Sequence, residues 1–152
     1  MEKRMSVMGV GHKAGAVVGG YLVLTVVLSC IFSPLFRITR DSYSVLLVIG
    51  IVIAAVGFSL NLAAAFRMLR AHRKDVLATE GLYGIFLHPM YFFQVLVTLP
   101  GITLLFNSWL VLTTVFVGIA AVKLFAKEEN HYLESRYGDA YRKYRRKVWI
   151  KF

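Results

Sequence analysis

The residues of this sequence that can take part in chemistry fall into two groups, one in the middle of the chain and one closer to its C-terminal end. The first holds His88, Pro89 and Tyr91, where an imidazole and a phenol can exchange hydrogen bonds with a ligand. The second is the adjacent pair Glu128 and Glu129, whose carboxylates accept hydrogen bonds and attract cations. Neither group places a nucleophile beside a base, so these residues favour a site that binds and orients reactants, and no catalytic nucleophile is assigned.

The two glutamates are not expected to act as a carboxylate pair on one atom. Neighbouring residues on a helix point about 100° apart, because the helix turns once in ~3.6 residues. We therefore expect one of Glu128 and Glu129 to face a site and the other to face a basic residue or water. Glu128 and His131 also show the Glu-x-x-His spacing of di-iron bundles. Such bundles need a second copy and two further glutamates, which are missing, so no metal is expected.

The stretch that contains the first group, residues 79–91, reads TEGLYGIFLHPMY and interrupts an apolar region. Glycine and proline weaken a helix, and a histidine near lipid is costly. Pro89 suits the first turn of a new helix, which places His88 at its rim. Gly81 and Gly84 allow the backbone to bend and to approach a ligand closely. We therefore expect a loop that forms one wall of a site.

The composition indicates a membrane protein. Of 152 residues, 58% are hydrophobic, whereas soluble domains usually have about 45–50%, and the mean hydropathy is +0.65. The formal net charge is +10, and the basic residues lie outside the apolar runs, where they orient a membrane protein and attract anionic headgroups. The segments that carry them are short and flank apolar spans, so nucleic-acid binding is not expected. The single cysteine, Cys30, excludes an internal disulfide and a cysteine-based metal cluster.

Four apolar segments each have about the 20 residues that a helix needs to cross the hydrocarbon core of a bilayer. They are residues 14–36, 43–66, 88–106 and 108–126. The sequence thus predicts an all-α fold, a polytopic membrane bundle of about four transmembrane helices, in a single domain that covers residues 1–152. The first segment is long enough to span and ends without a clear cleavage site, so we expect a retained helix and not a signal peptide.

Glycine and proline also predict how the spans pack. Gly50 and Gly57 in the second span favour close contact between helices. Pro100 and Gly101 fall inside the third span, which is therefore expected to be the least regular. Only a few residues around Asn107 separate the third span from the fourth, so these two spans should form an antiparallel hairpin.

The basic residues predict the orientation in the membrane. Sixteen of the 18 lysines and arginines fall in the N-terminal tail, the second loop and the C-terminal part, which four spans place on one side. The other two, Arg37 and Arg40, lie in the first loop on the opposite side. By the positive-inside rule both termini are cytoplasmic, and we expect a location in the bacterial inner membrane. Residues 79–91 and the C-terminal part then share the cytoplasmic side and can build one site.

The C-terminal part, residues 127–152, is polar and predicts an amphipathic helical tail. An apolar and aromatic stripe in it has helical spacing and should lie on the membrane surface or on the bundle. Gly138 followed by Asp139 resembles a helix end and a new N-cap, so two short helices are expected. The basic residues from Arg142 to Lys147 should face lipid headgroups. The stripe consists of Leu133, Tyr137, Tyr141, Tyr144 and Val148.

Taken in order, these motifs resemble the isoprenylcysteine carboxyl methyltransferase and phospholipid methyltransferase superfamily of integral membrane enzymes. The resemblance covers residues 77–148, about half of the chain, and no single motif is specific alone. The ordered set at the usual separations carries it. The motifs are Gly81-Leu82-Tyr83, His88-Pro89-Met90-Tyr91, Glu128-Glu129 after a helical hairpin, and Tyr137-Gly138-Asp139-x-Tyr141-x-x-Tyr144.

The resemblance implies a methyltransferase whose methyl donor is S-adenosylmethionine, held near the cytoplasmic face. It also implies an acceptor that reaches the site from the bilayer: a phospholipid amine, a prenylated or other lipophilic carboxylate, or a small apolar thiol. Membrane lipids are therefore the expected partners, and the oligomeric state stays open. The residues that match the family motifs, and would contact the cofactor or shape the loop over it, are His88, Tyr91, Glu128, Glu129, Tyr83 and Gly81.

The sequence also departs from the family pattern. Relatives often carry arginine at the positions of Gly84, Leu87 and Ala126, and proline at that of Leu82. Losing guanidinium groups removes partners that bind a carboxylate through two hydrogen bonds. The basic residues that could replace them are Arg70, Arg73 and Lys123.

Three functions therefore stay open. The first is an active membrane methyltransferase. The second is a non-catalytic member that kept the fold as a membrane-bound binding or interaction protein. The third, another lipid-modifying enzyme such as a reductase on a related helical fold, lacks a dinucleotide-binding motif to support it.

Overall fold

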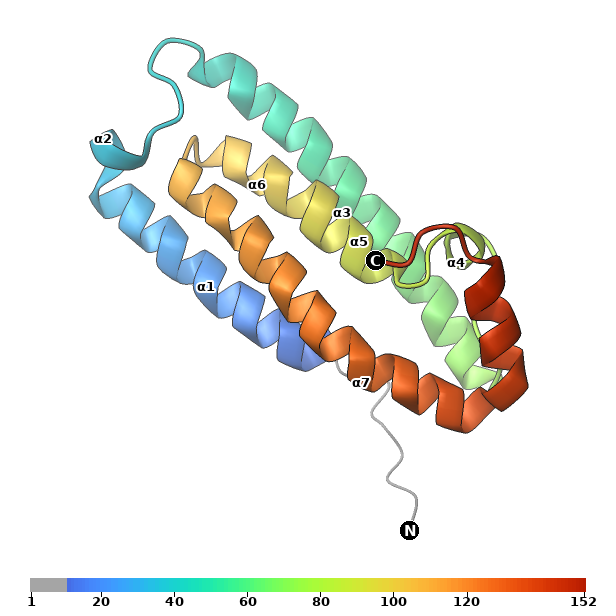
Figure 1. Ribbon diagram of the computed structural model, residues 1–152. Helices are drawn as coiled ribbons and strands as arrows, with labels where there is room; N and C mark the ends of the chain where they lie inside the picture. The colour runs from blue at the N-terminus through green and yellow to red at the C-terminus, as the bar shows by residue number, and fades with distance from the viewer. Residues whose placement is uncertain (1–10) are drawn as a thin grey trace.

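The computed structural model describes residues 11–152, which form a bundle of helices (Figure 1). The described range contains no β-strand, so the predicted all-α fold is confirmed. The N-terminal tail with Lys3 and Arg4, used above to predict the orientation, lies outside the described residues. The elements in chain order are α1 (Gly11–Ile31), α2 (Ser33–Phe36), α3 (Tyr43–Arg73), α4 (Leu82–Ile85), α5 (Pro89–Phe93), the π-helix η1 (Gln94–Thr98), α6 (Leu99–Leu105) and α7 (Trp109–Lys147).

Three of these helices, α1, α3 and α7, are long and apolar enough to cross a membrane. The third predicted span is the shorter apolar helical segment Pro89–Leu105. The ends of the spans were predicted less accurately than their existence. The first span ends at Ile31 because Pro34 cannot continue its hydrogen bonds. The second continues past residue 66 to Arg73, and the fourth continues past residue 126 to Lys147. The protein is an all-α membrane bundle.

The third span is irregular, as its proline predicted. Pro100 has no N–H to donate, and its ring would clash with the carbonyl of Leu96 in a regular α-helix. The turn before it widens into the π-helix η1, and the Thr98 hydroxyl donates to the carbonyl of Phe93 at 3.1 Å. Such a bulge lets a helix accommodate a misfit without a break. The segment therefore remains helical from Pro89 to Leu105 and keeps its N-terminal end at one end of the bundle.

Helix α3 packs against η1 and α6 through glycines, as the small residues predicted. A Cβ atom at Gly57 would lie 2.6 Å from the Thr98 hydroxyl. One at Gly101 would lie 2.5 Å from the backbone nitrogen of Ala54, and one at Gly50 would lie 2.9 Å from the Gly101 carbonyl oxygen. No side chain fits into these contacts, so the two helices meet backbone to backbone.

Helix α1 packs against α7 through paired hydroxyl groups. In a membrane, hydrogen bonds between side chains hold neighbouring helices together, because lipid offers no partner to a polar group. These pairs run along the length of the contact and fix the register of α1 on α7. They are Tyr21 with Thr113 (3.0 Å), Thr25 with Thr114 (3.3 Å) and Ser29 with Ser108 (2.7 Å).

Helix α7 leaves the bundle and then turns back. It bends at Gly138, which has φ +50° and ψ −122°, a conformation that is available almost only to glycine. After the bend, residues 139–147 run back toward α4 and the C-terminus (Figure 1). The break at Gly138 is thus confirmed, although the segment before it continues the fourth span and is not a separate short helix.

The apolar stripe of this C-terminal part faces the protein. Tyr141, Tyr144 and Val148 are buried in one cluster with Leu87, and Leu77, Leu133 and Tyr137 pack around them. The stripe therefore covers the loop that precedes α5 and does not lie on the membrane surface. This packing brings the loop and α7, which are far apart in sequence, to the same end of the bundle (Figure 1).

Candidate functional site

The loop before α5 has its shape imposed by one glycine. Gly81 has φ +63° and ψ −125°, and its carbonyl accepts a hydrogen bond from the N–H of Gly84 at 2.9 Å. A Cβ atom at Gly81 would lie 3.0 Å from Nε of Arg67 on α3. Gly81 therefore forms the tight turn of the predicted loop, and this turn lies against α3.

The C-terminal part of the chain holds this loop in place. Tyr83 is buried, and its carbonyl accepts a hydrogen bond from the Tyr144 hydroxyl at 2.8 Å. Ile150 adds two backbone hydrogen bonds: it donates to the Ile85 carbonyl at 3.0 Å and accepts from the N–H of Leu87 at 2.9 Å. The loop is thus fixed by residues that follow it by more than fifty positions, which pattern analysis of a single segment does not reveal.

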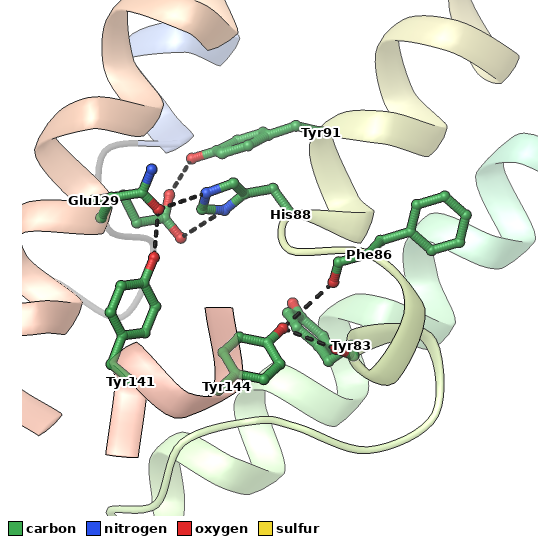
Figure 2. A network of polar contacts seen from close by, with 8 residues as sticks. Tyr83, Phe86, His88, Tyr91, Glu129, Tyr141 and Tyr144 are labelled. Carbon is green, nitrogen blue, oxygen red and sulfur yellow. Dashed lines mark hydrogen bonds and ion pairs between the residues drawn. The ribbon is translucent and has the colours of Figure 1, made fainter. Parts of the chain in front are cut away.

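Glu129 is the centre of the polar cluster that this loop helps to enclose (Figure 2). The Tyr91 hydroxyl donates to Oε2 of Glu129 at 2.6 Å, and Nδ1 of His88 lies 3.7 Å from Oε1. His88 and Tyr91 come from the start of α5, and Glu129 comes from α7. The His88 side chain is 4% exposed and that of Glu129 is 21% exposed. The carboxylate is therefore held at Oε2 by Tyr91, with the His88 ring near its other oxygen, and it can still be reached from outside.

The neighbouring glutamate points elsewhere. Oε2 of Glu128 lies 3.0 Å from Nζ of Lys13 on α1, and both side chains are about half exposed. One of the two glutamates was expected to face a basic residue or water, and Glu128 does face a basic residue, whereas Glu129 faces the cluster. Glu128, although predicted to bind the cofactor together with Glu129, does not belong to the cluster around His88 and Tyr91.

Two further residues complete the cluster and were not among the predicted site residues. Oδ1 of Asn130 accepts hydrogen bonds from Nε2 of His88 at 2.9 Å and from the Tyr141 hydroxyl at 2.5 Å. Tyr141 is fully buried. Its position in the C-terminal tyrosine motif pointed to it, whereas Asn130 had no signal except its place beside the glutamates. Together they connect His88 to the segment after Gly138.

Burial keeps the phenols of this region protonated. It raises the pKa of Tyr141 to about 12, and the charge of Arg145 acts in the opposite direction. Burial also raises the pKa values of Tyr83 and Tyr144, and the negative charge of Glu129 adds to the effect on Tyr83. At neutral pH these tyrosines are therefore hydrogen-bond donors, so Tyr141 and Tyr144 can hold the amide of Asn130 and the loop carbonyls.

At the positions where relatives often carry arginine, this chain has buried apolar residues or an exposed glycine. Leu87 is 5% exposed and packs in the cluster with Tyr141, and Ala126 is 7% exposed in the core between α1, η1 and α7. Gly84 is exposed on the outer side of the loop. The candidates to replace these arginines, Arg70, Arg73 and Lys123, are exposed. Arg145 is an exposed cation whose charge acts on the Tyr141 phenol.

Metal ligation has no candidate in residues 11–152, where no group of three or more His, Cys, Asp or Glu side chains could hold an ion. His131, one member of the Glu-x-x-His spacing, is exposed on α7. Its partner in that spacing, Glu128, pairs with Lys13. Glu128 and His131 therefore point to different surroundings and do not form a shared site in the described part of the chain.

Comparison with known proteins places the chain in a family. A family model described as phospholipid methyltransferase matches residues 44–140. The matched range contains the loop, the helical segment that begins at Pro89 and the two glutamates. No curated protein and no solved structure matches the chain. Because the family model covers more than half of the 152 residues, the chain belongs to the phospholipid methyltransferase family.

Proposed function

We propose that this protein is a membrane methyltransferase that binds S-adenosylmethionine at Glu129 and methylates a lipid or lipophilic acceptor. The observation that carries the proposal is the convergence of His88 and Tyr91, from the start of α5, on the Glu129 carboxylate of α7. The family supports methyl transfer in general. The cluster around Glu129 supports this position for the cofactor, because its hydrogen-bond donors and acceptors suit the polar parts of S-adenosylmethionine.

The residues fit the cofactor by charge and by hydrogen bonding. When bound, S-adenosylmethionine supplies a methyl group that its sulfonium already makes electrophilic. Glu129 can accept hydrogen bonds from ribose hydroxyls or pair with an ammonium, and its negative charge attracts a sulfonium. Asn130 and His88 offer the amide and imidazole groups that can bond the edge of a base. The 21% exposure of the Glu129 side chain leaves it accessible to such a ligand.

The protein's own part in the reaction is to position the reactants. A methyl transfer of this kind needs the acceptor, the methyl carbon and the sulfur in line, with water excluded. Tyr91 holds one oxygen of Glu129, and His88 and Tyr141 hold the Asn130 amide. The side chains that would meet the cofactor are thus locked by contacts within the protein before any ligand arrives. No nucleophilic side chain takes part.

The carboxylate of the cofactor's methionine part needs a cation. Arg145 is our candidate, since it is exposed on the segment after Gly138 and its charge reaches the Tyr141 phenol. It lies four residues after Tyr141 and therefore on the same side of that helical segment. In this role Arg145 replaces the arginines that relatives often carry at the positions of Gly84 and Leu87.

The acceptor is most simply an amine. An amine gains positive charge as it takes the methyl group, and Glu129 stabilises that charge. A carboxylate acceptor would instead need a cation beside the transferred methyl group, and Leu87 occupies one position of the missing arginines with a buried apolar side chain. We therefore propose a phospholipid amine or a similar lipophilic amine as the substrate.

The proposed orientation puts this site at the cytoplasmic face. The segment after Gly138 presents exposed basic residues, and the Trp149 side chain next to it is 88% exposed. Tryptophan and basic side chains of this kind favour the level of the lipid headgroups. A lipid headgroup and a soluble cofactor can thus meet at the same end of the bundle.

The proposal is tested by following a labelled methyl group. Membranes that contain the protein are incubated with S-adenosylmethionine labelled in its methyl group, and the lipids are extracted and separated. We expect label in an amine-containing lipid fraction with the wild type, and background label with Glu129→Gln. Label that is equal in membranes with and without the protein would contradict methyl transfer and would leave the non-catalytic alternative.

A further inference from the structure

The end of the bundle opposite Glu129 contains a polar pocket. Its lining residues come from the end of α1, from α2, from the first loop, from the start of α3 and from the turn between α6 and α7. Figure 1 shows these elements at the same end of the bundle. The volume of the pocket is about 300 Å³, at the lower end of the roughly 300–1,000 Å³ of small-molecule sites. Its polar wall includes Arg37, Arg40, Ser29, Ser33, Thr39 and Asn107.

The charge of this wall is positive only. Two guanidinium groups line the pocket, and no aspartate or glutamate does. Nη2 of Arg37 donates to the Ser33 hydroxyl at 2.9 Å, which fixes the direction of that side chain. Arg40 forms no hydrogen bond or ion pair with residues 11–152, so its donors remain available. Guanidinium groups match the oxygens of a phosphate in geometry and in charge.

The loop that carries both arginines is fixed before any ligand binds. Asn107, at the turn between α6 and α7, has φ +47° and clamps Thr39 from both sides. Its Oδ1 accepts from the Thr39 N–H at 3.0 Å, and its Nδ2 donates to the Thr39 carbonyl at 2.7 Å. The N–H of Ile38 also donates to the Asn107 carbonyl at 3.0 Å. The pocket is therefore a built part of the fold.

Aromatic side chains place this pocket at the depth of lipid headgroups. Phe36 and Trp109 are in edge contact with ring centroids 5.2 Å apart, and the Trp109 indole N–H donates to the Leu35 carbonyl at 3.3 Å. Trp109, Phe106 and Tyr43 are all more than two-fifths exposed around the pocket. Such aromatic belts lie at the boundary between hydrocarbon and headgroups, which is where lipid phosphates are found.

We propose that this pocket binds a phosphate group, through Arg37 and Arg40, at the membrane face opposite the Glu129 site. The phosphate can come from a lipid headgroup or from a soluble phosphate, since both present the same oxygens to the two guanidinium groups. In either case the site is separate from the methyl-transfer site, and it joins α1, α3 and the hairpin of α6 and α7 at their common end.

Trp109 provides a reporter for this site. Replacing the exposed Trp149 with phenylalanine leaves Trp109 as the single tryptophan of the chain. The purified Trp149→Phe protein in detergent is titrated with a short-chain phosphatidic acid and, separately, with inorganic phosphate, while the fluorescence is recorded. A short-chain phosphatidylcholine, whose choline shields the phosphate, serves as the lipid control.

We expect a saturable fluorescence change that weakens about tenfold when Arg37→Gln and Arg40→Gln are combined, a loss of ~1.4 kcal/mol in binding. Asp41→Asn changes a neighbouring charge outside the pocket and should keep the affinity or raise it. Saturation by phosphatidic acid alone identifies a lipid headgroup as the ligand, and saturation by inorganic phosphate as well identifies a soluble phosphate.

The absence of saturation with both probes would overturn the proposal. So would an equal response to phosphatidylcholine, or a response that the two arginine substitutions leave unchanged. The single variant Arg40→Gln guards against misfolding of the double variant, because Arg40 forms no hydrogen bond or ion pair within residues 11–152. It should weaken binding while the thermal unfolding temperature stays that of the wild type.

Discussion

Glu128 and Glu129 are neighbours in the chain, and their carboxylates meet opposite surroundings. Oε2 of Glu128 lies 3.0 Å from Nζ of Lys13 on an exposed surface, whereas Oε2 of Glu129 accepts a 2.6 Å hydrogen bond from the Tyr91 hydroxyl inside the cluster. The helix turns by about 100° from one residue to the next, which is enough to separate the two roles. The chain thus contains a natural control for its own candidate site.

Asn130 is predicted to stabilise the cluster by accepting two hydrogen bonds. Asn130→Ala leaves Nε2 of His88 and the hydroxyl of Tyr141 without an acceptor, which should lower the free energy of unfolding by about 2–4 kcal/mol. Asn130→Asp keeps the acceptor oxygen and should cost less. Unfolding in detergent measures both. Ser135→Ala, on the exposed side of the same helix, is the control, and equal stability of Asn130→Ala and Ser135→Ala would contradict the prediction.

The turn at Gly81 and the bend at Gly138 are predicted to require glycine. Both residues have positive φ with ψ near −120°, so Gly81→Ala and Gly138→Ala should each destabilise the protein by about 1–3 kcal/mol. Gly84→Ala is the matched control in the same loop, because its Cβ atom would only touch the Thr79 carbonyl at 3.5 Å. Thermal unfolding of the three variants separates these cases. A loss at Gly84 as large as that at Gly81 would contradict the prediction that the positive φ decides.

The buried tyrosines predict a loss of stability at alkaline pH. Folding raises the pKa of Tyr141 to about 12, while the unfolded chain releases this proton near pH 10. Between these values the folded state binds more protons, so its stability is complete below pH 10 and falls as the pH rises. Thermal unfolding from pH 8 to pH 12 should show this fall. Tyr141→Phe should make the fall shallower, and an unchanged slope would contradict the assignment.

The last residues of the chain are predicted to hold the loop beside His88. Removing residues 149–152 deletes the two hydrogen bonds between Ile150 and the loop, worth about 1–2 kcal/mol together, and the ring contact of Phe152 with Phe92. Hydrogen–deuterium exchange at the Leu87 amide should then become about tenfold faster. Trp149→Ala removes only an exposed side chain and should leave the exchange rate as it is. Equal exchange rates at Leu87 in the wild type, the truncated protein and Trp149→Ala would show that the loop keeps its structure without the last residues.

The sequence predicted the helices of this fold better than their ends. Apolar length identified the membrane-crossing helices, and Pro100 identified the irregular one. The ends were missed because helical hydrogen bonds continue into polar residues: α7 runs through Glu128 and Glu129 up to the bend at Gly138. Apolar patterning reports contact with lipid, and it does not report where a helix stops.

The candidate site was predicted in part. His88 was singled out because a histidine near lipid is costly, and Tyr91 and Glu129 were singled out because they match the family motifs. Asn130 was missed because a single amide on a helix surface has no pattern of its own. The contact of Ile150 with the loop was missed because it depends on how α7 folds back after its bend, which only the assembled structure shows.

The measurement that tests the account most directly compares the two glutamates in cofactor binding. Isothermal titration calorimetry of the purified protein with S-adenosylmethionine should give saturable binding for the wild type and for Glu128→Gln. Glu129→Gln should bind at least about tenfold more weakly, because it loses a charged hydrogen-bond acceptor worth roughly 1.5–3 kcal/mol. The absence of binding by the wild type at millimolar cofactor, or equal binding by Glu128→Gln and Glu129→Gln, would contradict a cofactor site at Glu129.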